Sequence, residues 1–149
     1  MTVVVAQTPD AVQRMLAVRV HEARQRLEPF FSPVLSLEMG GSSHFASPRG
    51  YATTLVMGGD RFHIRVADKF LQAGLERQDA ILRHEIGHLV DFSVPSHFLS
   101  STIAHLPETP ERRADAIATW LWGDLIRYDE DDVQTLASGT SPRPERLGL

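Results

Sequence analysis

The pattern H-E-x-x-H occurs at His84-Glu85-Ile86-Gly87-His88 and points more directly to chemistry than any other feature of the sequence. Histidines four residues apart lie one turn apart on the same face of a helix, so two imidazoles can bind one metal ion. A glutamate between them is placed beside a water molecule on that metal and can take its proton. The spacing therefore predicts a zinc site with His84 and His88 as ligands and Glu85 as the general base.

The chain contains seven histidines and no cysteine, which restricts the kind of metal site that it can form. Without thiolates, disulfides and sulfur-bound structural zinc sites are excluded, and any ligands must be nitrogen or oxygen atoms. A catalytic zinc ion normally has three protein ligands and keeps a fourth position for water. The two histidines of the motif therefore need a third protein ligand from another segment.

The motif lies within a segment of helical period that runs from Leu75 to about Phe92. An apolar stripe along this helix should face the core, and it consists of Leu82, Ile86 and Leu89. The two histidines fall on the opposite side, which also allows a simpler interpretation as exposed surface residues without a metal. Against it, Ile81 beside them indicates that this face is covered. Gly87, which costs about 1 kcal/mol within a helix, indicates close packing or access at this position.

A further helix is predicted from Thr109 to about Arg127, because threonine is a good N-cap and Pro110 suits the first helical position. Within its first two turns, Glu111 and Asp115 lie one turn apart on one face. Acidic residues at this end are also favoured by the helix dipole. The spacing alone therefore leaves open whether they bind a metal or are solvated.

The motif His84-Glu-Ile-Gly-His88 followed by Glu111-x-x-Ala-Asp115 resembles the gluzincin metallopeptidases. In that family the third zinc ligand is a glutamate on a downstream helix, and an aspartate four residues later accepts a hydrogen bond from the first histidine. The resemblance, which covers about residues 61–122, implies that Glu111 is the third ligand and Asp115 the partner of His84. The short chain is most similar to the minimal members, the minigluzincins and the ImmA/IrrE-type peptidase domains.

Other zincin branches fit the sequence less well. The metzincin extension requires glycine and histidine where this chain has Asp91 and Val94. The SprT-like pattern requires a third histidine followed by glycine, and neither His97 nor His105 is followed by one. These two histidines are the alternative ligands if Glu111 points away. Together with Tyr128, they are also the candidates for stabilising a tetrahedral intermediate.

The remaining segments predict an α+β fold. Alternating apolar residues indicate strands at 34–39, 51–57 and 61–66, and Gly58-Gly59-Asp60 is a suitable hairpin turn between the last two. A helix from Asp10 to about Leu27 precedes them, residues 40–50 form a loop, and residues 96–107 an irregular connection. We expect a small zincin-like domain, with a short twisted sheet of about three strands packed on the motif helix and the glutamate helix.

Length and composition are typical of one globular domain. The chain has 149 residues, of which 42% are hydrophobic and 23% charged, so we expect a single domain over residues 1–149 with a flexible tail at 138–149. The net charge of −4 argues against nucleic acid as a partner. No signal peptide and no apolar stretch of membrane-spanning length is present, so we expect a cytoplasmic protein without membrane contact. The sequence does not indicate an oligomeric state.

These features together predict a zinc-dependent endopeptidase that hydrolyses peptide bonds in a peptide or protein substrate. We expect an extended substrate to pair with the sheet along Arg61–Val66 and residues 96–106 to form one wall of the cleft. A second hypothesis is a latent or inactive protein of zincin fold that regulates or binds a partner. A third is a helical surface without any metal.

Overall fold

The structure is a computed structural model and describes residues 9–40 and 51–123. The elements in chain order are α1 (Pro9–Leu27), β1 (Val34–Gly40), β2 (Ala52–Gly58), β3 (Arg61–Ala67), the short 3-10 helix η2 (Asp68–Gln72), α2 (Leu75–Ser93), α3 (Ser96–Thr102) and α4 (Pro110–Trp122). The predicted α+β class is therefore confirmed. Of the loop predicted at 40–50, Gly40 is the last residue of β1 and the other residues lie outside the described ones, as do Tyr128 and the tail at 138–149.

The three strands form one mixed sheet in the order β1-β3-β2. β1 runs parallel to β3, with Val34 opposite Arg61, whereas β2 runs antiparallel to β3, with Thr54 opposite Ile64. The predicted turn joins β2 to β3, and Gly58 has a φ of 121° and Gly59 a φ of 58°. Glycine adopts these positive angles without the steric cost that a Cβ atom would add, so the turn explains both glycines.

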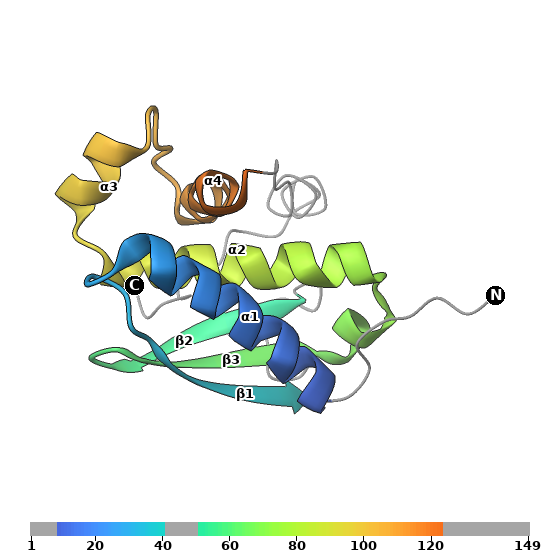
Figure 1. Ribbon diagram of the computed structural model, residues 1–149. Coiled ribbons are helices and arrows are strands. Elements are labelled where there is room, and N and C mark those ends of the chain that lie inside the picture. Colours follow the sequence, from blue (N-terminus) through green and yellow to red (C-terminus); the bar gives the residue numbers. More distant parts are fainter. Residues whose placement is uncertain (1–8, 41–50, 124–149) are drawn as a thin grey trace.

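The helices are stacked on one face of the sheet (Figure 1). α1 and α2 lie against the sheet, and α4 packs on the side of α2 that is turned away from it (Figure 1). α2 is therefore sandwiched between the strands and α4, and every residue from 81 to 90 is buried. A helix in this position can present side chains to the sheet and to α4 at the same time.

The hydrophobic core lies between the sheet and these helices. Three side chains from β3 and three from α2 are almost completely buried in it: Phe62, Ile64 and Val66, and Leu82, Ile86 and Leu89. The helix residues are the apolar stripe predicted to face the core, and that prediction is confirmed. Burial of these six apolar side chains stabilises the contact between α2 and the sheet, at about 1.5 to 3 kcal/mol for each fully buried residue.

The structure corrects two predicted elements. Residues 96–102, predicted as part of an irregular connection, form the helix α3, because Leu99 is fully buried and Phe98 packs against Phe30 with ring centroids 5.1 Å apart. α4 ends at Trp122 rather than near residue 127, because Gly123 adopts a left-handed conformation with a φ of 78°. A glycine in this conformation is a common helix terminator.

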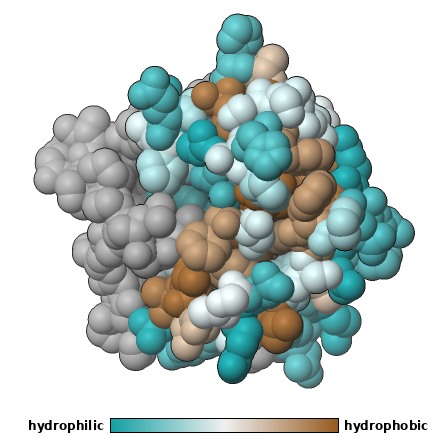
Figure 2. Space-filling model, turned by 90° about the vertical axis from the view of Figure 1, so that its left-hand side faces the viewer, coloured by the Kyte–Doolittle hydropathy of each residue, from teal (hydrophilic) through white to brown (hydrophobic). Residues whose placement is uncertain are grey.

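One end of the molecule carries exposed apolar side chains. They come from the segment after α1, the start of β1, the end of β2 and the end of α2, and they are Phe30, Val34, Met57 and Phe92. These element ends lie together on the left in Figure 1, and Figure 2 shows apolar residues gathered across that face between hydrophilic areas. Within the described residues, no helix is both long and apolar enough to cross a membrane.

Candidate metal centre

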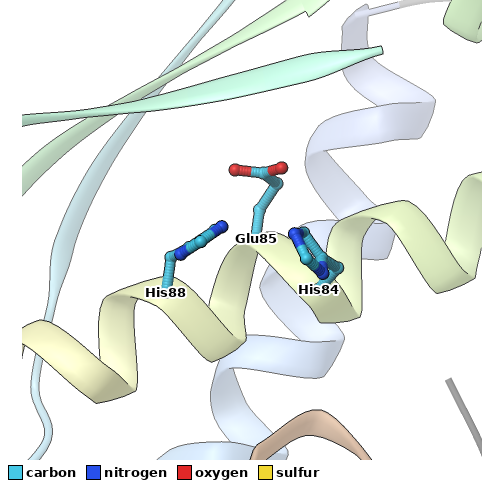
Figure 3. Close-up of side chains that lie close together, drawn as sticks. All are labelled: His84, Glu85 and His88. Atoms are coloured by element: carbon cyan, nitrogen blue, oxygen red, sulfur yellow. The ribbon is translucent and has the colours of Figure 1, made fainter. Parts of the chain in front are cut away.

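The middle of α2 brings the three chemical groups of the H-E-x-x-H motif together. One nitrogen of His84, one nitrogen of His88 and one carboxylate oxygen of Glu85 all lie within 4.8 Å of one another, and all three residues have an exposure of 0%. The two imidazole rings are perpendicular, with centroids 4.7 Å apart. Figure 3 shows that the three side chains leave α2 next to one another and that the carboxylate of Glu85 is directed towards the strands.

The first turn of α4 adds the carboxylate of Glu111 to this group. Its Oε1 atom lies 2.9 Å from Nε2 of His84 and 3.3 Å from Nε2 of His88. Nitrogen and oxygen ligands of a tetrahedral zinc ion are separated by about 3.3 to 3.6 Å, given ligand distances of about 2.0 to 2.2 Å. Oε1 of Glu111 therefore lies close to both imidazoles, at one separation within this range and one that is shorter.

Asp115 lies one turn further along α4 and contacts the other ring nitrogen of His84. Nδ1 of His84 and Oδ1 of Asp115 are 2.6 Å apart, and the aspartate is itself buried. A carboxylate only accepts hydrogen bonds, so the imidazole donates from Nδ1. Burial opposes the charged form of His84, but the hydrogen bonds and charges of Asp115 and Glu111 outweigh it and raise the pKa of His84 to about 10.

The chemistry of these donors fits a metal ion. When His84 is neutral and donates from Nδ1, its Nε2 atom carries a lone pair that faces the Glu111 oxygen at 2.9 Å. Two electron-rich atoms so close together in a buried site require a positive charge, either a proton on Nε2 or a metal ion. Histidine ligands of metals commonly donate their other nitrogen to a carboxylate, and Asp115 accepts such a hydrogen bond from His84.

Sequence reasoning missed Thr54, which contacts the predicted general base. Thr54 is fully buried on β2, and its Oγ1 atom donates a hydrogen bond of 2.7 Å to Oε1 of Glu85. Strand alternation places Thr54 on the same face as Ala52 and Val56, so its hydroxyl lies on the core side of an otherwise apolar face. A buried hydroxyl needs a hydrogen-bond partner, and that signal could have identified the residue.

Gly87 allows α4 to approach α2 closely enough to form the site. A Cβ atom at this position would overlap the carbonyl oxygen of Ala114 and lie 2.9 Å from its carbonyl carbon. Ala114 sits between Glu111 and Asp115 in the sequence, so the point of closest approach is also the point where the two carboxylates reach His84. Close packing therefore explains a glycine that costs stability in the middle of a helix.

Replacing Gly87 by alanine should separate the two helices. We expect the free energy of unfolding to fall by about 1 to 3 kcal/mol, although alanine is the better helix former, because the new methyl group meets backbone atoms. Zinc binding should weaken in parallel as Glu111 moves away from the histidines. Chemical denaturation and zinc titration of the purified variant measure the two effects.

Gly74→Ala is the matched control for this experiment. Gly74 is the N-cap of α2, and a Cβ atom there would meet nothing within 4 Å. The control should change the free energy of unfolding by less than about 1 kcal/mol and leave zinc binding as it is. Equal effects of the two substitutions would contradict the role given to the contact between Gly87 and Ala114.

An ion pair between Arg113 and Asp91 connects the start of α4 to the end of α2. The guanidinium of Arg113 contacts both carboxylate oxygens of Asp91, at 2.7 Å from Nη2 and 3.0 Å from Nε, and Nη1 donates to the carbonyl oxygen of Pro107 at 3.2 Å. Paired hydrogen bonds between arginine and a carboxylate fix orientation as well as distance. This contact holds the first turn of α4, which carries Glu111, against α2.

Two other predictions can be compared with the structure. His97 and His105 are exposed, and neither belongs to the group of side chains among the described residues that could hold a metal ion, which consists of His84, Glu85 and His88. The prediction that a substrate pairs with Arg61–Val66 is wrong. This segment belongs to β3, which is the central strand and is hydrogen-bonded on both sides. Within the described residues, strand addition is therefore restricted to β1 or β2.

Removing the hydrogen-bond acceptor of His84 should weaken metal binding. We expect Asp115→Ala to lower the affinity for zinc by about 10- to 100-fold, because the imidazole loses the contact that fixes its tautomer and orientation. Asp115→Asn keeps a carbonyl oxygen at the same place and should lose less. Competition against a zinc chelator measures both affinities, and an unchanged affinity in Asp115→Ala would refute the orienting role.

Comparisons with known proteins gave no match. No family model matches the chain, and neither the curated proteins nor the solved structures gave a significant match.

Proposed function

We propose that the chain is a zinc-dependent endopeptidase of gluzincin type, with His84, His88 and Glu111 as zinc ligands and Glu85 as general base. One observation carries the proposal: Nε2 of both histidines lies within 3.3 Å of the same Glu111 oxygen in a buried site. The resemblance of the H-E-x-x-H motif and the downstream glutamate to gluzincins supports the same ligand set. The substrate would be a peptide or protein, and the compartment would be the cytoplasm.

The chain's own residues would hold the metal, orient a ligand and move a proton. Zinc, when bound, lowers the pKa of a coordinated water towards about 7 and polarises the carbonyl group of the scissile bond. Glu85 takes the proton from the attacking water and delivers it to the nitrogen of the leaving amine, which allows the C–N bond to break. Asp115 keeps the Nδ1 proton of His84 in place, so that Nε2 stays available for the metal.

Digestion of a peptide library tests the proposed activity. The purified full-length chain, loaded with zinc, should cleave internal peptide bonds, and a chelator should abolish the cleavage until zinc is restored. Cleavage that continues in the presence of the chelator would contradict a zinc-dependent reaction. Absence of cleavage by a chain that holds stoichiometric zinc would contradict the peptidase and favour the second candidate below.

The second candidate is a latent or inactive protein of zincin fold that regulates or binds a partner. It is favoured by the complete burial of His84, Glu85 and His88, because a substrate must reach both the metal and the base. The two candidates share the metal site and differ in turnover. Stoichiometric zinc distinguishes both of them from a helical surface that binds no metal.

A further inference from the structure

We propose that Thr54 is a positioning residue for the general base, an inference that rests on the proposed peptidase function. Its hydroxyl donates to Oε1 of Glu85 at 2.7 Å, and both residues have an exposure of 0%. The contact joins β2 to the middle of α2, across 31 residues of sequence. It therefore couples the sheet directly to the group that would move the proton.

A glutamate carboxylate rotates broadly about its terminal bond, so an unrestrained base has no fixed orientation. A donor on one of its two oxygens fixes the plane of the carboxylate and stabilises its ionised form, which is the form that accepts a proton. Thr54 itself is fixed by the sheet, because its strand neighbour Ile64 lies in the fully buried core of β3. The hydroxyl group is therefore held in a position from which it can orient the carboxylate of Glu85.

The neighbours of Thr54 on its face of β2 are apolar. Ala52, two residues earlier on the same face, is fully buried and apolar, and Val56, two residues later, is apolar as well. Packing on this face would be served equally well by valine, which has the shape of threonine without the hydroxyl. The hydroxyl is therefore explained by its hydrogen bond to Glu85 and not by the core.

The first test measures turnover in the zinc-loaded full-length chain. Thr54→Val should reduce kcat by about 10- to 100-fold, as expected for a misplaced catalytic group, with KM within about twofold and zinc content unchanged. Thr54→Ser restores the hydroxyl and should recover most of the lost kcat. Thr53→Val, the same substitution on the opposite face of β2, is the matched control and should leave kcat unchanged.

The second test uses thermal unfolding and does not depend on activity. Thr54→Val should lower Tm by roughly 3 to 10 °C, because the buried Glu85 loses the hydrogen bond from Thr54, but should have little effect in a Glu85→Ala background. Equal lowering of Tm in both backgrounds would show that the hydrogen bond between Thr54 and Glu85 does not contribute to stability, and would overturn the proposed contact.

The activity of the wild-type chain distinguishes failure of the two proposals. A wild-type chain that cleaves no peptide would contradict both the proposed function and the positioning role. A wild-type chain that cleaves, with an unchanged kcat in Thr54→Val, overturns the positioning role alone.

Discussion

Glu85→Gln is expected to keep its zinc and to lose about 10²- to 10⁴-fold in turnover. Glutamine has nearly the same shape as glutamate and still offers an oxygen to Thr54, but its amide cannot accept a proton at neutral pH. The loss therefore corresponds to the contribution of a general base, which is typically of this size. Steady-state kinetics and elemental analysis of the same purified preparation give both quantities.

Glu76→Gln is the matched control for the general base, because Glu76 lies in the exposed first turn of the same helix. It should retain both zinc and turnover. Full activity in purified Glu85→Gln would refute the assignment of the base while leaving the ligands untouched. Loss of zinc in that variant would instead indicate that Glu85 binds the metal, since its carboxylate lies within 4.8 Å of both imidazoles.

Glu111→Ala is expected to have the second large effect, on metal binding. Removing one of three protein ligands should lower the affinity for zinc by about 10³-fold or more, so that the purified variant holds little metal. Glu108→Ala, an exposed glutamate just before α4, is the matched control and should keep its zinc. Unchanged zinc in Glu111→Ala would contradict the ligand set and direct the search to His97 or His105.

The proximity of His84 and His88 on α2 could be predicted from the sequence because a helix places residues four apart on one face. The same periodicity predicted that Leu82, Ile86 and Leu89 face the core, and the structure confirms their burial. The position of Glu111 relative to the two histidines could not be predicted in this way, because periodicity does not determine how its helix packs against α2. Its position was implied only by the resemblance to gluzincins, and in the structure it depends on the close approach of Gly87 to Ala114.

The order of the strands could not be predicted from the sequence. Alternation identifies the buried face of each strand, and Phe62, Ile64 and Val66 are indeed buried, but it does not say which strand is central. Alternation alone therefore allows this segment to pair with a substrate, whereas in the structure it occupies the middle of the sheet. The contact of Thr54 with Glu85 was missed for the same reason, because it depends on which strand crosses α2.

Native mass spectrometry of the full-length chain tests the metal centre most directly. The proposed site predicts one zinc ion per chain in the wild-type protein, lost on treatment with a chelator and absent from Glu111→Ala. Retention of that ion by Glu85→Gln in the same measurement would separate the ligands from the base. A wild-type chain that binds less than stoichiometric zinc when zinc is supplied would contradict the metal centre, and the proposed peptidase with it.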